Sequence, residues 1–519
     1  MTCCFSTIPL VSPFIASGKT SRGVSSINYE LPRYVSCLRL SHRLLIKLPP
    51  TGNRPASKHI HILDDDSLLN IFSFCRPLTL DESEAPNIGI IEEGKWNRGL
   101  WWYILAHVCH RWRYVVLESP SYLQLSLLCT HRTPVADMLA NSPSFPLVID
   151  HLVDTGDAEG IILALQHRDR VRRIRLRNIV PELQKLILAL DGEYPILEYM
   201  VIQHQSYFTH RSTIETSLNL PETFRAPHLR QLVMTDFDIP IGSPLLPIMG
   251  NLVTLYLDLI SPSTHSHPNA LLQRISLMPH LKTLGIFSRS HFSSGDITRH
   301  LWRVPITTHV TLPNLRWFGF KGSSAYLEAL LPWISFPLLE NLHVYFFDEA
   351  IYSIPRLQQY MGTAGNFCPI SITLIFNVHH LDLMAHFPKG CLSLSFCECH
   401  LERQVASAAR FLYTLGTVLS AVERLTLRYE RHFAPSTWNN EAHRTWWRKL
   451  LRLFSKVKAI LVDGELVEQL SDSLQPGEGE SLMELLPELR ELSYYSTDAP
   501  DDPFAPFIDA RLKAGHPVT

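Results

Sequence analysis

Six arginines crowd into residues 167–178, where they could form an anion-binding surface. If residues 171–176 form a strand, then Arg173, Arg175 and Arg177 project together from one of its faces. Guanidinium groups form strong, paired hydrogen bonds with carboxylates and phosphates. The pattern predicts a binding site for a phosphorylated or acidic segment of a partner protein. The alternative is a solvated basic edge that pairs with local acids.

A second set of reactive side chains lies at Cys397, Cys399 and His400. Zinc ligands usually come in pairs separated by two to four residues, with a second pair elsewhere. The two cysteines are closer than that, and a strand would turn His400 to the opposite face. The histidines and the cysteine within residues 107–110 fit helix packing better than metal binding. We therefore expect no metal site.

Motifs of the common catalytic sites are missing from the sequence. It contains no GxSxG, HExxH, GxxxxGK[ST] or GxGxxG, and no active-site cysteine signature. We expect that the protein is not an enzyme and holds no cofactor. The tryptophans at 438, 446 and 447 suit helix packing, because no basic groove for nucleic acid accompanies them.

The composition is that of a folded protein, with 46% hydrophobic and 18% charged residues among 519. A formal net charge of −2 gives no argument for nucleic acid or a membrane surface as partner. The longest apolar stretches, such as residues 99–106, are too short to span a bilayer. Ten scattered cysteines are typical of reduced thiols and favour a cytoplasmic or nuclear location.

Residues 1–58 are rich in serine and basic residues and contain a single acid, Glu30. We interpret them as a flexible tail. A mitochondrial transit peptide has a similar composition, but several prolines and the lack of an amphipathic period speak against it. An artefact of start-codon placement is the third reading.

Residues 59–128 predict a small helical docking module. Asp64, Asp65 and Asp66 suit the start of a helix, and an apolar face follows at Leu68, Ile71, Phe72 and Cys75. Residues 76–98 are rich in acids, Pro, Gly and Asn, which indicates an exposed insert. A second helix should end near Ser119 and bury one periodic face, made of Trp101, Leu105, Val108, Trp112, Val115 and Val116.

The segments LDDDSLLNIF and LAHVCHRWRYVVLESPSYLQL resemble the two halves of the F-box motif. The pattern as a whole resembles F-box proteins of mushroom-forming fungi. Members of that family dock on the Skp-type adaptor of cullin-based ubiquitin ligases, while a downstream domain selects the substrate. The resemblance implies adaptor-facing or module-core roles for Leu63, Leu68, Ile71, Phe72, Val108 and Trp112.

The first half departs from the family pattern at two positions. The family usually has Pro after the first Leu and Glu two positions later, where this chain has Asp64 and Asp66. An aspartate caps a helix well, so the helix start should survive. Both helices could instead belong to one continuous core.

From Val171 onward, a pattern of apolar-x-x-apolar-x-apolar recurs ten times. Its copies begin 23 to 35 residues apart, except for one gap of 83 residues that could hold two strand-like units at 370–376 and 391–396. The copies begin at Val171, Leu197, Leu229, Leu252, Leu281, Leu315, Leu339, Val422, Val457 and Leu489. In six of them a proline lies two residues before the first apolar position. We interpret this proline as a turn that ends a helix and starts a strand.

The predicted fold is therefore α/β. A small all-helical module precedes an irregular leucine-rich-repeat-like α/β solenoid over residues 145–500. Such an array needs caps, and the docking module with strand 145–151 could cap one end while residues 501–519 cap the other. A single α/β domain of another topology is the alternative.

Function is expected to follow this layout. The leading hypothesis is a substrate-recruiting subunit that binds the Skp-type adaptor and cullin complex through residues 59–128 and an unknown protein target through the array. The rival is a non-ligase repeat scaffold whose helices only cap the array. A hidden enzyme in an unrecognised α/β domain comes third.

Overall fold

The computed structural model describes residues 63–75, 101–131, 133–152, 158–178, 180–204, 220–235, 250–259, 268–288, 305–347, 354–363, 368–398, 400–419, 421–430, 440–475, 485–494 and 502–519. The chain divides into two compact units, residues 1–236 and 237–519. The predicted tail at 1–58 and the predicted insert at 76–98 lie outside the described residues.

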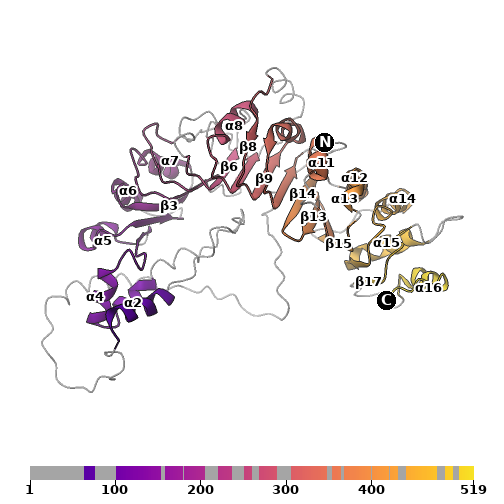
Figure 1. Cartoon of the computed structure of the whole chain (residues 1–519), viewed down its shortest axis with the longest axis horizontal. Coiled ribbons are helices and arrows are strands. Elements are labelled where there is room, and N and C mark those ends of the chain that lie inside the picture. Colours follow the sequence, from indigo (N-terminus) through magenta and orange to yellow (C-terminus); the bar gives the residue numbers. More distant parts are fainter. Residues whose placement is uncertain are drawn as a thin grey trace. The chain divides into compact units, whose positions relative to one another are not determined.

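The first unit joins short helices to a parallel sheet (Figure 1). Its helices are α2 (Asp65–Phe74), α3 (Trp101–Ala106), α4 (His110–Glu118), α5 (Val135–Asn141), α6 (Ala158–Gln166) and α7 (Val180–Leu188). Its strands are β1 (Leu127–Cys129), β2 (Leu147–His151), β3 (Val171–Asn178), β4 (Tyr199–His204) and β5 (Gln231–Thr235). The five strands lie side by side in chain order, and every neighbouring pair is parallel.

Most strands of the second unit lie in one sheet, whereas Val310–Thr311 and Ile334–Ser335 pair separately. Its strands are β6 (Thr254–Leu259), β7 (Thr283–Ser288), β8 (Val310–Thr311), β9 (Trp317–Gly322), β10 (Ile334–Ser335), β11 (Asn341–Phe346), β12 (Ser371–Asn377), β13 (His380–Phe387), β14 (Gly390–Cys397), β15 (Arg424–Glu430), β16 (Ala459–Val462) and β17 (Glu491–Tyr494). Its α-helices are α8 (Pro268–Ile275), α10 (Ser324–Leu330), α11 (Pro355–Thr363), α12 (Leu401–Tyr413), α13 (Gly416–Leu419), α14 (Asn440–Leu451), α15 (Val467–Leu474) and α16 (Ala505–Lys513). Two short 3₁₀ helices lie at Leu331–Trp333 and Gly464–Leu466.

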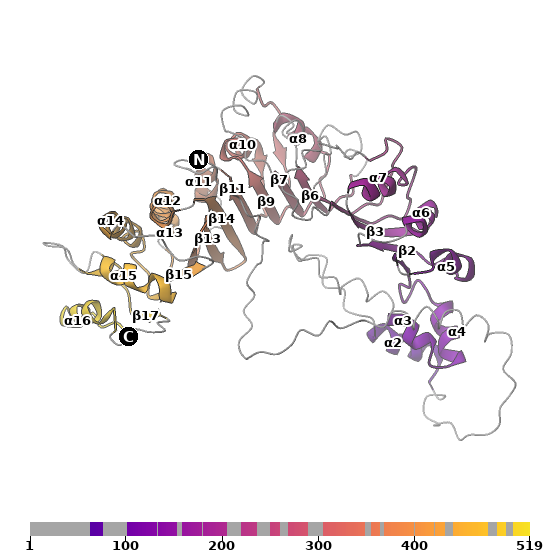
Figure 2. The ribbon, with the colours of Figure 1, turned by 180° about the vertical axis from the view of Figure 1, so that it is seen from behind.

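Helices cover one face of this second sheet. Figures 1 and 2 show α8, α11 and α12 on the same side of the strands that they accompany. Strand β11 alternates accordingly: Leu342 and Val344 are buried toward the helices, whereas His343 and Tyr345 lie on the opposite face. We call this opposite side the open face of the sheet.

Each of the ten repeated patterns forms one strand of a sheet. The strand begins two residues after the first apolar position in nine copies, and at that position in β3. The prediction of a mixed α/β fold built from repeated strand-and-helix units is confirmed. Strand 145–151 is also present, as β2.

The recurring proline sits in a β-turn rather than simply at a helix end. In the copy at Leu197, the amide of Leu197 donates to the carbonyl of Tyr194, and Pro195 is the second residue of that turn. Proline favours this position because its ring fixes φ near −65°. The same bond recurs at Leu229, Leu281, Leu315, Leu339 and Leu489. The first and last turn residues are buried, so the turn places two core side chains at once.

The gap of 83 residues holds an antiparallel insertion. The two strand-like units predicted there are β12 and β14, but β13 runs antiparallel between them. The strand order across this region is β11–β14–β13–β12–β15. Simple repetition of parallel units is therefore wrong for this part of the array.

Residues 501–519 were predicted to cap the array, and 502–519 are described. The Arg511 side chain of α16 is fully buried and donates to the carbonyls of Leu486, Pro487 and Leu489 at the turn before β17. Thr519 exchanges backbone hydrogen bonds with β17, accepting from Leu492 and donating to Arg490. These contacts cover the free edge of β17.

Candidate functional site

The docking module begins with a capped helix. Asp64 is extended, and its carboxylate accepts a 2.6 Å hydrogen bond from the backbone amide of Ser67. Hydrogen bonding from Ser67 lowers the pKa of Asp64, and the charge of Arg111 adds to this effect. Asp64 therefore starts α2 as an N-cap, in the way the sequence predicted.

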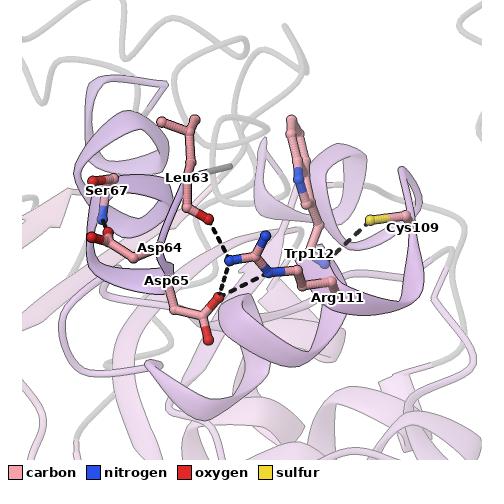
Figure 3. A network of polar contacts seen from close by, with 7 residues as sticks. All are labelled: Leu63, Asp64, Asp65, Ser67, Cys109, Arg111 and Trp112. Carbon is pink, nitrogen blue, oxygen red and sulfur yellow. Dashed lines mark hydrogen bonds and ion pairs between the residues drawn. The ribbon is translucent and has the colours of Figure 1, made fainter. Parts of the chain in front are cut away.

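Arg111 joins the two halves of the module (Figure 3). From the first turn of α4, its guanidinium donates to Asp65 Oδ1 at 2.8 and 3.0 Å and to the carbonyl of Leu63 at 2.5 Å. Leu63 and Asp65 lie 48 and 46 residues earlier in the sequence. Nothing in the local sequence pattern around Arg111 indicates this bridge.

The core of the module is small. Leu68 and Phe72 are buried on one face of α2, and the ring of Phe72 packs edge-on against Trp112 at 4.8 Å between centroids. Leu68, Phe72 and Trp112 therefore pack in the core of the module, which is one of the two roles that the resemblance implied. Leu63 is half-buried beside them.

The second predicted helix is broken into two. α3 ends at Ala106 and α4 begins at His110, and Cys109 caps α4 by accepting from the amide of Trp112. Arg113 donates to the carbonyl of Ala106 and so satisfies the end of α3. A single helix over this region is therefore wrong. Val108, predicted on the buried face of that helix, lies in the connection and is 55% exposed.

Several large apolar side chains of the module face solvent. Ile71 is 44% exposed and Phe74, one helical turn along α2, is 88% exposed. Six of the twelve exposed large hydrophobic residues among those described belong to the module, namely Ile71, Phe74, Ile104, Val108, Tyr114 and Tyr122. Phe74 and Ile104 were missed because they fall outside the buried face that the periodicity detects.

Trp102 connects the module to the first strand of the sheet. Its indole nitrogen donates to the carbonyl of Ser126, just before β1, and its ring packs edge-on against Phe145, just before β2. The sequence pattern had assigned this contact face to Trp101, but Trp102 is the buried residue.

The arginine segment does not form the predicted array of three solvent-facing guanidiniums. Arg175 is 1% exposed and forms two 2.7 Å hydrogen bonds with Asp150 of β2, its direct neighbour in the sheet. Arg173 is half-buried and Arg177 is exposed on the same face. The expectation is wrong for Arg175, because a carboxylate 25 residues earlier neutralises it inside the protein.

No group of three or more His, Cys, Asp or Glu able to hold a metal occurs in the described part of the chain. Cys397 lies in β14 and His400 precedes α12, while Cys399 lies outside the described residues. Within the same ranges no helix is long and apolar enough to pass through a bilayer.

One Cys–His pair lies on the open face of the second unit. Cys391 Sγ is 3.6 Å from Nε2 of His343. Burial raises the pKa of the Cys391 thiol and lowers the pKa of His343 to about 4. Both groups are therefore neutral near pH 7, which is the opposite of what an activated thiolate needs. The pair is a packing contact and supports no covalent catalysis.

The chain matches no family model, and no curated protein matches it. Among solved structures, a leucine-rich-repeat-containing protein from Legionella pneumophila is similar over 65% of this chain and 97% of its own length. Its sequence identity is 12% and its TM-score is 0.26. The repeat character of this chain rests on its own strands and turns.

Proposed function

We propose that this protein is a non-enzymatic, substrate-recruiting F-box subunit of a cullin-type ubiquitin ligase. Residues 59–128 would bind the Skp-type adaptor, and the repeat array would bind a protein target. The ligase would then act by proximity, since catalysis comes from its other subunits.

The observation that carries the proposal is the exposed apolar surface of the module. Ile71 and Phe74 project from α2 although Leu68 and Phe72 already fill its core face. A three-helix module this small buries little surface alone, and a partner that covers Ile71, Phe74 and Val108 would complete it. Ile71 and Val108 belong to the two segments that resemble the F-box motif, and Phe74 lies two residues after the first of them.

The structure sharpens the choice of test residues. Leu68 is 1% exposed, so its replacement by aspartate would unfold the module and say nothing of the adaptor. Ile71 and Val108 are exposed, and a charge there leaves the core intact. Leu188 of α7 is 65% exposed and serves as a matched control in a repeat helix.

The test is capture of purified Skp-type adaptor by the full chain. The wild type and Leu188→Asp should capture the adaptor equally, and Ile71→Asp and Val108→Asp should each weaken capture by about tenfold or more, as for a buried interface residue. Circular dichroism of each variant checks that it is folded. A folded wild type that captures no adaptor contradicts the ligase role.

One observation favours the second candidate, a repeat scaffold whose helices only cap the array. Trp102 ties the module to the residues before β1 and β2, which is what an end cap requires. In that case Trp102→Ala would destabilise β1 and β2, and no variant of Ile71 or Val108 would change any interaction of the protein.

A further inference from the structure

Two arginines lie on one face of β15, in the arrangement that the sequence had predicted for the arginines of β3. Leu425 and Leu427 are buried toward the helices, so Arg424, Thr426 and Arg428 lie together on the open face. We call these three residues the β15 basic strip. Arg424 is exposed, and Arg428 and Thr426 are half-buried.

Neither guanidinium of the strip has an ion pair or a hydrogen bond within the described part of the chain. The pKa of Glu423 is lowered first by its hydrogen bond with Lys458, and the charge of Arg424 adds to this effect. The neighbouring Glu423 is held by Lys458, whose ammonium lies 2.5 Å from its carboxylate. In contrast, Arg175 of β3 is neutralised by Asp150. The strip therefore has positive charge available for an external anion.

The strands beside β15 leave this charge uncompensated. On β12, Ser371, Thr373 and Ile375 lie directly beside Arg424, Thr426 and Arg428. On β16, Ala459 and Leu461 lie beside Arg424 and Thr426. None of these five neighbours carries a charge, and two of them offer hydroxyl groups that can donate to an anion.

Glu491 of β17 lies on the same face at the level of Arg424, two strands away, whereas Asp382, Glu430 and Asp463 lie at or beyond the level of Arg428. Asp382 of β13 contacts His380 at 3.1 Å, and Glu430 is two residues past Arg428. Asp463 follows the end of β16 and has an interaction of its own. The positive strip from Arg424 to Arg428 is therefore bordered by Glu491, two strands away, and by acids at and beyond Arg428.

We infer that the β15 basic strip binds an extended, carboxylate-bearing segment of a partner protein. At about 3.3 Å per residue, Arg424 and Arg428 are about 13 Å apart along the strand. An extended segment lying beside them has the same repeat, so acidic side chains four residues apart match both guanidiniums. Small hydroxyl residues on β12 allow that segment to approach closely. This inference rests on the proposed role of the array in binding a target, and it does not involve the adaptor.

The experiment measures fluorescence anisotropy of labelled twelve-residue peptides with the full chain. The probe carries two Glu residues four apart in a Gly/Ser/Thr background, and matched peptides carry Gln at both positions or Glu two apart. The wild type should bind the first probe about tenfold more tightly than the Gln peptide, with weaker binding at higher salt. R424E/R428E should lose this binding, and R424K/R428K should retain part of it. Arg177→Glu, an exposed arginine on β3, is the matched control and should bind as the wild type does.

Several results would overturn the inference. They are absence of binding by the wild type, equal binding of the Glu and Gln peptides, unchanged binding by R424E/R428E, or loss of binding in Arg177→Glu. A phosphoserine peptide that binds where the Glu peptide does not would overturn the assignment to carboxylates. Ile71→Asp should bind the probe normally, so a failure of adaptor capture and a failure of this inference remain distinguishable.

Discussion

The guanidinium of Arg111 contacts one carboxylate oxygen of Asp65 through two of its nitrogens, across a separation of 46 residues. Its third hydrogen bond reaches the carbonyl of Leu63, at the residue before the α2 cap. Arg111 thus fixes the first helix of the docking module to the third, in addition to the packing of Phe72 against Trp112. The contact also fixes the orientation of α2, and so the geometry of the exposed surface that Ile71 and Phe74 present to a partner.

Replacing Arg111 with Gln should loosen the module without unfolding the sheet. The Asp65 pair is about half exposed, so most of its Coulomb energy is screened, and the loss should be about 1 kcal/mol or less, mainly from the Leu63 carbonyl. Hydrogen exchange of α2 amides measures the effect. Asp66→Ala is the control, because Asp66 is exposed and its side chain forms no hydrogen bond or ion pair with α4 among the described residues. Equal protection of α2 in Arg111→Gln and the wild type would contradict the bridge.

Asp64 should make the start of α2 sensitive to acid. Its pKa is lower when folded than when unfolded, so its contribution is complete above the ordinary value of 3.8 and is lost as the pH falls through the folded pKa. The amide of Ser67, followed by NMR between pH 6 and 2, reports the loss of the cap. Asp64→Asn retains a capping side chain but does not titrate, so its Ser67 amide should show no such transition.

The buried pair of Asp150 and Arg175 predicts a large effect from a small change. Asp150→Asn leaves the Arg175 charge without its carboxylate and should cost about 3–5 kcal/mol of the free energy of unfolding of the first unit. Arg172→Gln breaks a half-exposed pair with Glu198 and should cost about 1 kcal/mol or less. Urea denaturation compares the two variants. Similar losses from both would mean that Arg175 is hydrated in solution.

His343 should make the second unit less stable at mildly acidic pH. Burial lowers its pKa to about 4 from 6.5, so between these values the unfolded chain binds more protons than the folded chain. Stability should be complete above pH 6.5 and should fall by up to about 3 kcal/mol as the pH approaches 4. His343→Gln should reduce this slope, measured by urea denaturation at a series of pH values. An unchanged slope would show that His343 is solvated.

Much of the fold could be predicted because its signal is local. The apolar spacing that marks each strand spans six residues, and the proline before Leu197 or Leu229 fixes a β-turn within four. Each turn and each strand can therefore be predicted from a short window of sequence. Helix α2 could be predicted for the same reason, since its cap and its core residues, Asp64, Leu68 and Phe72, lie within nine positions.

The features that were missed depend on contacts between distant residues. Nothing near Arg175 indicates that Asp150 neutralises it, and nothing near Arg111 points to Leu63. The break between α3 and α4 arises at Cys109, whose sulfur caps a helix although cysteine is rarely counted as a cap. The segment of β13 alternates like the parallel strands around it, and its antiparallel direction is set by pairing with β12 and β14.

The reversed meander of β12, β13 and β14 has a consequence for how the array assembles. In a regular solenoid each new unit docks on the one before it, so order can spread along the chain from a single nucleus. Here β12 follows β11 in sequence but does not pair with it, and the strand that does is β14. Propagation from β11 must therefore wait until the whole meander has formed. We expect two separate nuclei, one on each side of β14, whose joining limits the rate of folding.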